Sequence, residues 1–197
     1  MNPVTHFFAG WVSGLPFELE RRDRALIVVA SMAPDVDGLP VLLDLLKRHS
    51  PDAMMFWSEY HHSLHNLAFA AAFSLVCAGL ARRRVVTALV CFAVVNLHYL
   101  CDVIGSRGPD GYQWPIPYLR PFSDKWQLTV PWQWELNAWP NVLITAALLA
   151  ATLYYSWKRG YSPAAIFSER GDQVFIKTLR LRFGVPVATS GASHEKK

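Results

Sequence analysis

Long uncharged segments alternate with short charged ones along this chain, and the pattern predicts helices. Residues 64–81 and 85–101 contain no charged residue and no proline, and Arg82, Arg83 and Arg84 separate them. Each segment is too long for a strand. As helices they would each be roughly 27 Å long, close to the hydrocarbon thickness of a bilayer. The pattern therefore predicts a membrane-embedded helical hairpin that turns at the three arginines.

Three further segments complete the predicted bundle. Residues 142–157 are apolar and follow Pro140, which suits the first turn of a helix. Residues 25–33 form a shorter apolar segment, either a half-span or a buried helix that extends backward through the charged residues before it. Residues 39–48 carry apolar side chains on one helical face and charges on the other, which predicts a short amphipathic helix in the membrane interface.

The other parts of the chain are less regular. Residues 105–140 are rich in Pro, Trp, Tyr and Gly, which predicts a long ordered surface loop with its tryptophans near the water–lipid boundary. Residues 161–186 are polar and basic and predict a short helical or extended piece, and we expect residues 187–197 to be a disordered tail. The expected fold is all-α: a membrane-embedded helical bundle over residues 1–160 with a long Trp/Pro-rich loop.

Composition agrees with an apolar environment and excludes several classes of protein. Hydrophobic residues make up 52% of the chain and charged residues 17%, against ~25% charged residues in a usual soluble domain. This excludes a disordered or coiled-coil protein, and a net charge of +4 does not indicate a nucleic-acid partner. The three cysteines lie in apolar segments and lack the spacing of a disulfide framework or zinc knuckle. We also expect no cleavable signal peptide, because no basic region followed by an apolar stretch opens the sequence.

Basic residues predict how the helices lie across the membrane. They cluster at 21–24, at 82–84 and at 158–159, and one alternating path of helices places all three clusters on the cytoplasmic side. The bias is moderate, because five basic residues fall on the opposite face: Lys47, Arg48, Arg107, Arg120 and Lys125. We therefore expect a multi-pass membrane protein.

Histidine and aspartate collect at the opposite, extracytoplasmic ends of the predicted helices. His61, His62 and His65 open one leg of the hairpin, and His98 and Asp102 close the other. The hairpin brings these segments to the same end. His61 and His65 are four residues apart, as are His98 and Asp102, so each pair would share a helix face. Two such pairs on adjacent helices can converge on a metal ion, whereas His62 would point away.

Residues from other segments can join this cluster. Asp35 and Asp37 end the short apolar segment and could bridge or complete a ligand shell from a loop. His6 could reach the same end if residues 7–15 form a helix. The candidate general bases are Asp37 and Glu59.

Several of these residues also have a structural interpretation. Asp102 could cap a helix or lie at the interface, His98 could be a satisfied core histidine, and residues 35–37 could form a plain turn. An unpaired ionisable group at membrane depth is costly, which favours a functional role for Asp102.

The candidate ligands point to metal-assisted hydrolysis. Histidine and aspartate without cysteine suit Zn²⁺, with Mn²⁺ or iron as alternatives. Their number exceeds the needs of one tetrahedral zinc, which favours two ions that share a carboxylate and activate water against a phosphoester. The substrate would be a small molecule or a membrane lipid. The chain has no Gly-rich phosphate loop, no G-x-S-x-G and no H-E-x-x-H, which disfavours P-loop, serine and zincin chemistry.

Two other interpretations stay open. The chain could be a non-catalytic membrane protein with a structural metal or a lipid-binding site, since structural metal sites are closed and catalytic ones keep an open position. It could also be a soluble helical hydrolase with an unusually apolar core.

The same short motifs occur in the same order in a known family. Over roughly residues 1–157 the chain resembles the YdjM-like family through Thr5-His6, Pro34-Asp35-Val36-Asp37, the block from His61 to Asn66, and His98-Tyr99-Leu100-Cys101-Asp102. The loop segment from Trp114 to Leu119, with Pro121-Phe122-Ser123 after it, is also similar. The resemblance implies a membrane-bound, metal-dependent hydrolase of the bacterial inner (plasma) membrane, of a family regulated by the LexA repressor in some bacteria.

The resemblance also implies a ligand set. Its members would be His6, Asp35, Asp37, His61, His65, His98 and Asp102. The family often has an arginine where this chain has His62, and its histidine block is longer. Either His61 or His62 could therefore occupy the ligand position. The resemblance implies a chemistry and not a substrate.

Overall fold

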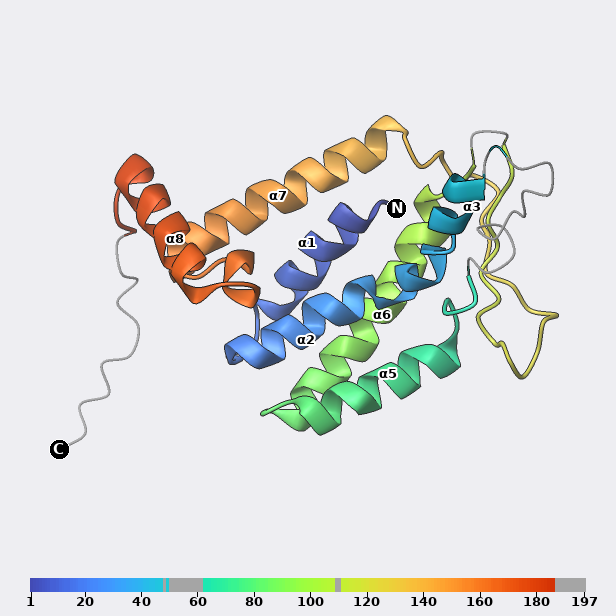
Figure 1. Cartoon of the computed structure of the whole chain (residues 1–197), viewed down its shortest axis with the longest axis horizontal. Helices are drawn as coiled ribbons and strands as arrows, with labels where there is room; N and C mark the ends of the chain where they lie inside the picture. The colour runs from blue at the N-terminus through green and yellow to red at the C-terminus, as the bar shows by residue number, and fades with distance from the viewer. Residues whose placement is uncertain (48, 50–61, 109–110, 187–197) are drawn as a thin grey trace. The chain divides into compact units, whose positions relative to one another are not determined.

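The computed structural model describes residues 1–47, 49, 62–108 and 111–186, and it divides into two compact units (Figure 1). Unit 1 comprises Met1–Leu149 and unit 2 comprises Ala150–Lys197. The all-α prediction is confirmed: the described residues form helices joined by loops, with two isolated β-bridges and no strand. Both bridges lie in the predicted Trp/Pro-rich loop, where Arg107 pairs with Glu135 and Ile116 with Leu128.

Unit 1 contains helices over the predicted segments and two further helical elements, at residues 3–14 and 33–38. In chain order they are α1 (Pro3–Gly14), α2 (Arg21–Met32), the 3-10 helix η1 (Ala33–Gly38), α3 (Val41–Lys47), α5 (Leu67–Leu80), α6 (Arg84–Gly105) and the start of α7 (Trp139–Arg159). The short apolar segment is a helix that extends backward through the charged residues, because α2 begins at Arg21. Helices α5 and α6 form the predicted hairpin, and α2 packs beside α6 (Figure 1).

The helix α5 begins later than the hydrophobic pattern predicts. Asn66 is its N-cap and accepts from the Phe69 backbone N–H at 2.9 Å, so the chain from His62 to His65 forms a turn outside the helix. His65 therefore does not lie on a helix face, and the expected helical pairing with His61 is wrong for this reason. With 14 residues, α5 is about 21 Å long at the usual helical rise.

Close packing of α1 against α2 positions the N-terminal residues. Asn2 caps α1 by accepting from the Thr5 backbone N–H at 2.9 Å. A Cβ atom on Gly10 would lie 2.1 Å from Ser31 Oγ, so only glycine allows this approach. Ser31 Oγ in turn donates to the His6 carbonyl at 2.9 Å, which ties the first turns of α1 to the end of α2.

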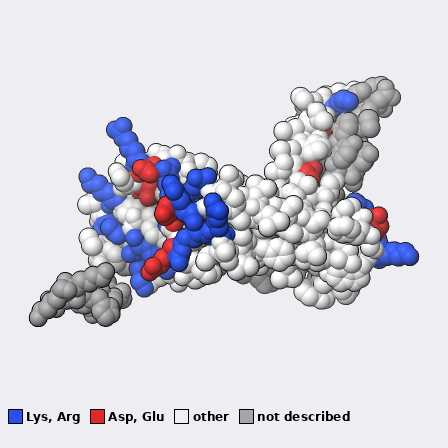
Figure 2. Space-filling model, turned by 90° about the horizontal axis from the view of Figure 1, so that it is seen from below, with Lys and Arg blue, Asp and Glu red and all other residues white. Residues whose placement is uncertain are grey.

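Two helical stretches in the described part of the chain are long and apolar enough to cross a membrane, Arg21–Lys47 and Arg84–Gly105. Exposed apolar side chains cover the outer faces of α5 and α6, including Leu75, Val76, Val85, Leu89 and Leu100. Figure 2 shows a broad surface without Lys, Arg, Asp or Glu. Such a surface is typical of helices that face lipid.

Unit 2 contains the rest of α7, the 3-10 helix η2 (Pro163–Ile166) and α8 (Glu169–Phe183). The predicted polar segment is thus largely helical. Ser168 caps α8 by accepting from the Gly171 backbone N–H at 3.1 Å. Asp172 accepts from the backbone N–H and hydroxyl of Ser162 at 2.7 and 2.6 Å. The predicted tail, residues 187–197, lies outside the described residues.

Candidate metal centre

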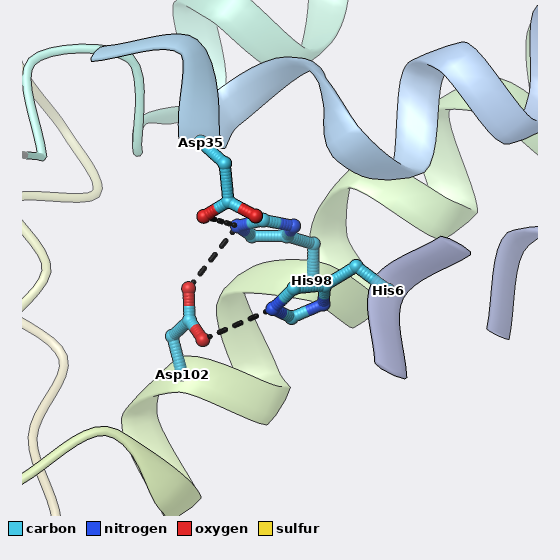
Figure 3. Close-up of side chains that lie close together, drawn as sticks. All are labelled: His6, Asp35, His98 and Asp102. Atoms are coloured by element: carbon cyan, nitrogen blue, oxygen red, sulfur yellow. Dashed lines mark ion pairs between the residues drawn. The ribbon is translucent and has the colours of Figure 1, made fainter. Parts of the chain in front are cut away.

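Side chains from three helical segments meet inside unit 1 (Figure 3). His6 comes from α1, Asp35 from η1, and His98 and Asp102 from α6. Their candidate ligand atoms all lie within 4.8 Å of one another. His6 and His98 are 1% exposed and Asp102 is 4% exposed, so little water reaches these side chains. The structure thus brings together four of the residues that the sequence singled out.

Asp102 lies at the centre of this cluster. Its Oδ1 is 3.3 Å from His6 Nε2, and its Oδ2 is 3.1 Å from His98 Nε2. Asp35 Oδ1 is 3.6 Å from the same nitrogen of His98. The His6 and His98 rings stack with their centroids 3.7 Å apart. Two imidazoles and two carboxylates therefore face one small volume.

A backbone carbonyl fixes the orientation of His98. Its Nδ1 lies 2.8 Å from the carbonyl oxygen of Ser31, at the end of α2. Because a carbonyl can only accept, Nδ1 carries a proton and donates it there. In the neutral ring the Nε2 lone pair is then directed at the carboxylates of Asp35 and Asp102, a repulsive arrangement that a cation relieves. Histidines that bind metals usually have such a partner on the other ring nitrogen.

His65 adds a third imidazole from the turn before α5. Its Nε2 is 3.2 Å from His98 Nε2 and 3.3 Å from Asp102 Oδ2. Its Nδ1 lies 3.1 Å from Asp37 Oδ2, which also accepts from the Leu64 backbone N–H at 2.9 Å. Burial lowers the pKa of His65, but hydrogen bonds to Asp102 and Asp37 outweigh it and raise the pKa to about 9. The surroundings of His65 therefore favour positive charge at this point of the cluster, which a bound metal ion would supply in place of the ring proton.

Two buried atoms of the cluster have no hydrogen-bond partner within the described ranges, His6 Nε2 and Asp35 Oδ2. Buried polar atoms are nearly always paired, so both atoms need a partner. Imidazole nitrogens together with carboxylate oxygens are donors that Zn²⁺, Mn²⁺ and iron accept. The residues present therefore fit a divalent metal ion.

The other predicted site residues lie at the edge of the cluster or outside the described residues. His62 is buried, has a φ of 77°, and packs its ring against His65 and Trp114 at centroid distances of 4.8 and 5.2 Å. It thus contributes to the wall beside His65. His61 and Glu59 lie outside the described residues and stay predictions.

Sequence reasoning missed three residues that contact the cluster or its supporting turn. The α-amino group of Met1 donates to Asp102 Oδ1 and to Ser106 Oγ. Ser106 donates to Asp102 Oδ1 at 2.9 Å, and its position four residues after Asp102 on the sequence is a signal that could have found it. The Tyr99 hydroxyl lies 2.9 and 3.0 Å from two carbonyl oxygens of the turn before α5, and nothing in the local sequence marks this role.

A cavity of about 390 Å³ reaches the cluster. It is lined by Asp35 and Asp102, by the first residues of the chain, and by residues of η1 and the Trp/Pro-rich loop. A small molecule in this cavity would lie against two candidate ligands. The cluster is therefore open to this cavity at Asp35 and Asp102.

A comparison with protein families identifies the chain. The family model described as YdjM inner membrane protein matches residues 1–168. Comparisons with curated proteins and with solved structures give no match. Because the match covers most of its length and every described residue of the cluster, the chain belongs to the YdjM inner membrane protein family, as the resemblance predicted.

Proposed function

We propose that this chain is a multi-pass inner membrane hydrolase that cleaves a phosphoester with the help of a bound divalent metal. The observation that carries the proposal is the convergence of three imidazoles and two carboxylates in a buried cluster, His6, His65, His98, Asp35 and Asp102. A cavity that reaches two of these residues supports a catalytic over a purely structural role.

The described residues provide enough donors for the metal. His6, Asp35, His98 and Asp102 would hold it, with His65 as a further ligand. Zinc is the first candidate, and manganese and iron accept the same donors. When bound, the metal supplies Lewis-acid chemistry, because it lowers the pKa of a water molecule and neutralises charge on a phosphoryl oxygen. Three imidazoles and two carboxylates exceed the needs of one tetrahedral ion, which favours a second ion.

The two acids of η1 would then have different roles. Asp37 Oδ2 holds His65 Nδ1, so this carboxylate orients a ligand and fixes its tautomer. Asp35 lines the cavity, and its Oδ2 has no hydrogen-bond partner within the described ranges. Asp35 would therefore act as a metal ligand. Asp37 and Glu59 stay the candidate general bases that the sequence predicts.

The proposed orientation places the cluster on the extracytoplasmic face of the membrane. Helix α6 begins at Arg84, beside the basic turn, and carries His98 and Asp102 in its last two turns. Basic residues favour the cytoplasmic side. The metal centre would then lie on the opposite side, where a lipid or small-molecule phosphoester would reach it.

Metal analysis followed by a phosphoester screen tests this proposal. We expect the purified protein to retain one or two divalent ions per chain by mass spectrometry, and to hydrolyse at least one phosphoester in a chelator-sensitive manner. The His98→Ala variant should lose both properties, since it removes an imidazole from the centre of the cluster.

The same experiment separates the alternatives. Retained metal without turnover of any phosphoester would favour a structural metal site in a non-catalytic membrane protein. Wild-type protein that holds no metal after purification in metal-supplemented buffer would contradict the proposal.

A further inference from the structure

The cavity that reaches the metal cluster is lined by a cationic residue that the proposed mechanism does not use. Arg107 lines this cavity together with Asp35 and Asp102. It follows α6 and is adjacent in sequence to Ser106, whose hydroxyl donates to Asp102 Oδ1 at 2.9 Å. One cavity is thus lined by an arginine and by the two carboxylate residues of the cluster.

The backbone of Arg107 is held firmly on both sides. Its N–H donates to the Trp134 carbonyl at 3.0 Å, and its own carbonyl accepts from the Leu136 N–H at 3.2 Å. These bonds fix the start of the side chain against the Trp/Pro-rich loop. A side chain that begins at a fixed point loses less conformational freedom when it binds a ligand.

The guanidinium group itself has spare donors. Its Nε is buried and has no hydrogen-bond partner within the part of the chain that the structure describes. Its Nη2 lies 3.7 Å from Glu135 Oε1, and the two side chains are 35% and 44% exposed. An ion pair of this length and exposure contributes little. Arginine recognises phosphate through several N–H groups in one plane, and this partly exposed guanidinium has only a long ion pair, so its Nη groups are able to donate to an anion.

The rest of the cavity is mostly apolar. Pro3, Leu39, Trp114 and Leu136 contribute to its walls. Leu39 is 57% exposed and Leu136 is 48% exposed, so apolar surface continues to the outside of the molecule. A small polar phosphoester would leave this surface uncovered, whereas a molecule with an apolar part would cover it.

We propose that this cavity binds an amphiphilic phosphoester, such as a lipid phosphate. Arg107 donates to an oxygen of its phosphate group, and the apolar wall holds its hydrocarbon part. The inference rests on the proposed hydrolase function and specifies the substrate class of the same centre. It identifies Arg107 as a substrate-binding residue of the cavity.

Binding of a non-hydrolysable lipid tests the proposal. The probe is a dihexanoylglycerol phosphonate, added to the full-length protein in detergent and measured by isothermal titration calorimetry. We expect Arg107→Gln to weaken binding at least tenfold and Arg107→Lys to weaken it less, because lysine keeps the charge but not the planar donors. Glu135→Gln is the matched control and should bind at least as tightly as wild type, since it removes only the weak partner of Arg107.

Two further probes separate the contribution of the hydrocarbon chains to binding from that of the phosphonate group. Glycerol phosphonate, which lacks the chains, should bind at least tenfold more weakly than the lipid, and dihexanoylglycerol, which lacks the phosphonate, should be insensitive to Arg107→Gln. Equal binding of the chainless probe would overturn the amphiphile assignment. Equal binding of the lipid probe to Arg107→Gln and wild type would overturn the role of Arg107, provided that both retain the same metal content.

The outcome can be separated from that of the proposed function. Chelator-sensitive hydrolysis with unchanged lipid binding in Arg107→Gln would overturn this inference alone. Binding of the lipid phosphonate through Arg107 in a protein without chelator-sensitive hydrolysis would overturn the proposed function alone and support the binding site.

Discussion

The two ends of the α5–α6 hairpin each bury an aspartate, but the two carboxylates face different groups. At the basic end, Asp23 is 0% exposed and accepts from the backbone N–H groups of Arg82 and Arg83 at 2.8 and 2.9 Å. At the other end, Asp102 is 4% exposed, and its Oδ2 faces the Nε2 atoms of His65 and His98 at 3.3 and 3.1 Å. Its Oδ1 accepts from the Met1 α-amino group and the Ser106 hydroxyl.

This difference separates a structural acid from a candidate metal ligand. Both oxygens of Asp23 are satisfied by N–H groups whose protons are fixed, so the site is complete as it stands. The cluster around Asp102 contains imidazole lone pairs and two atoms without hydrogen-bond partners in the described chain, His6 Nε2 and Asp35 Oδ2. Burial alone therefore does not distinguish a structural aspartate from a metal ligand, because that depends on which groups surround its carboxylate oxygens.

The largest expected contrast between the two ends is their accessibility from outside the cell. We expect a cysteine introduced by Phe122→Cys to react with a membrane-impermeant thiol reagent in intact cells, and one introduced by Arg84→Cys to react only after permeabilisation. Phe122 is 86% exposed in the loop, and Arg84 is exposed at the start of α6. The unsubstituted chain is the control, since its own cysteines are buried or partly buried. Labelling of the Arg84→Cys variant in intact cells would contradict the proposed orientation.

The next largest effect concerns the central carboxylate. Asp102→Asn should weaken metal binding at least about a hundredfold, beyond the 10–100-fold typical of residues that only support a ligand. The substitution removes the charge that faces three imidazoles, those of His6, His65 and His98. Metal content by mass spectrometry and competition with a chelator measure the change. Unchanged affinity would show that the cluster is not the metal site.

A smaller effect is expected at Asp37, which contacts the candidate ligand His65. Asp37→Asn should weaken metal binding about tenfold, because it perturbs the group that orients His65 without removing a ligand. The same chelator competition measures it, with Asp102→Asn for comparison. A loss as large as that of Asp102→Asn would instead identify Asp37 as a ligand, in agreement with the ligand set that the family resemblance implies.

Much of this contrast could be predicted from the sequence. The uncharged segments on both sides of the three arginines predicted the hairpin. The hairpin in turn predicted that His98 and Asp102 lie at the same end as the histidine block. The four-residue spacing of His98 and Asp102 correctly placed them on one face of α6. These features depend on local period and length, which a sequence displays directly.

The rest depends on contacts between distant residues. Local sequence does not show that the Asn66 cap and the Tyr99 hydroxyl hold His65 in a turn before α5. Nor does it show that Gly10 lets α1 approach Ser31 and so places His6 on the cluster. Asp23 lies between arginines and resembles part of a solvated charged turn, although its partners are the N–H groups of a turn about 60 residues away.

The smallest expected effect on metal binding comes from the structural acid. Asp23→Asn should change metal affinity less than about twofold but lower the free energy of unfolding by about 1.5–3 kcal/mol, the range for hydrogen bonds to a charged group. An asparagine oxygen can still accept from one backbone N–H, whereas its NH₂ group would face the other. Denaturant unfolding in detergent measures the loss. The matched control is Asp124→Asn, which removes an exposed ion pair with Arg120 at 2.8 Å and should cost about 0–1 kcal/mol. Loss of metal binding with an unchanged free energy of unfolding in Asp23→Asn would contradict the assignment of Asp23 as a structural residue, because the basic end of the hairpin would then contribute to metal binding and not to stability.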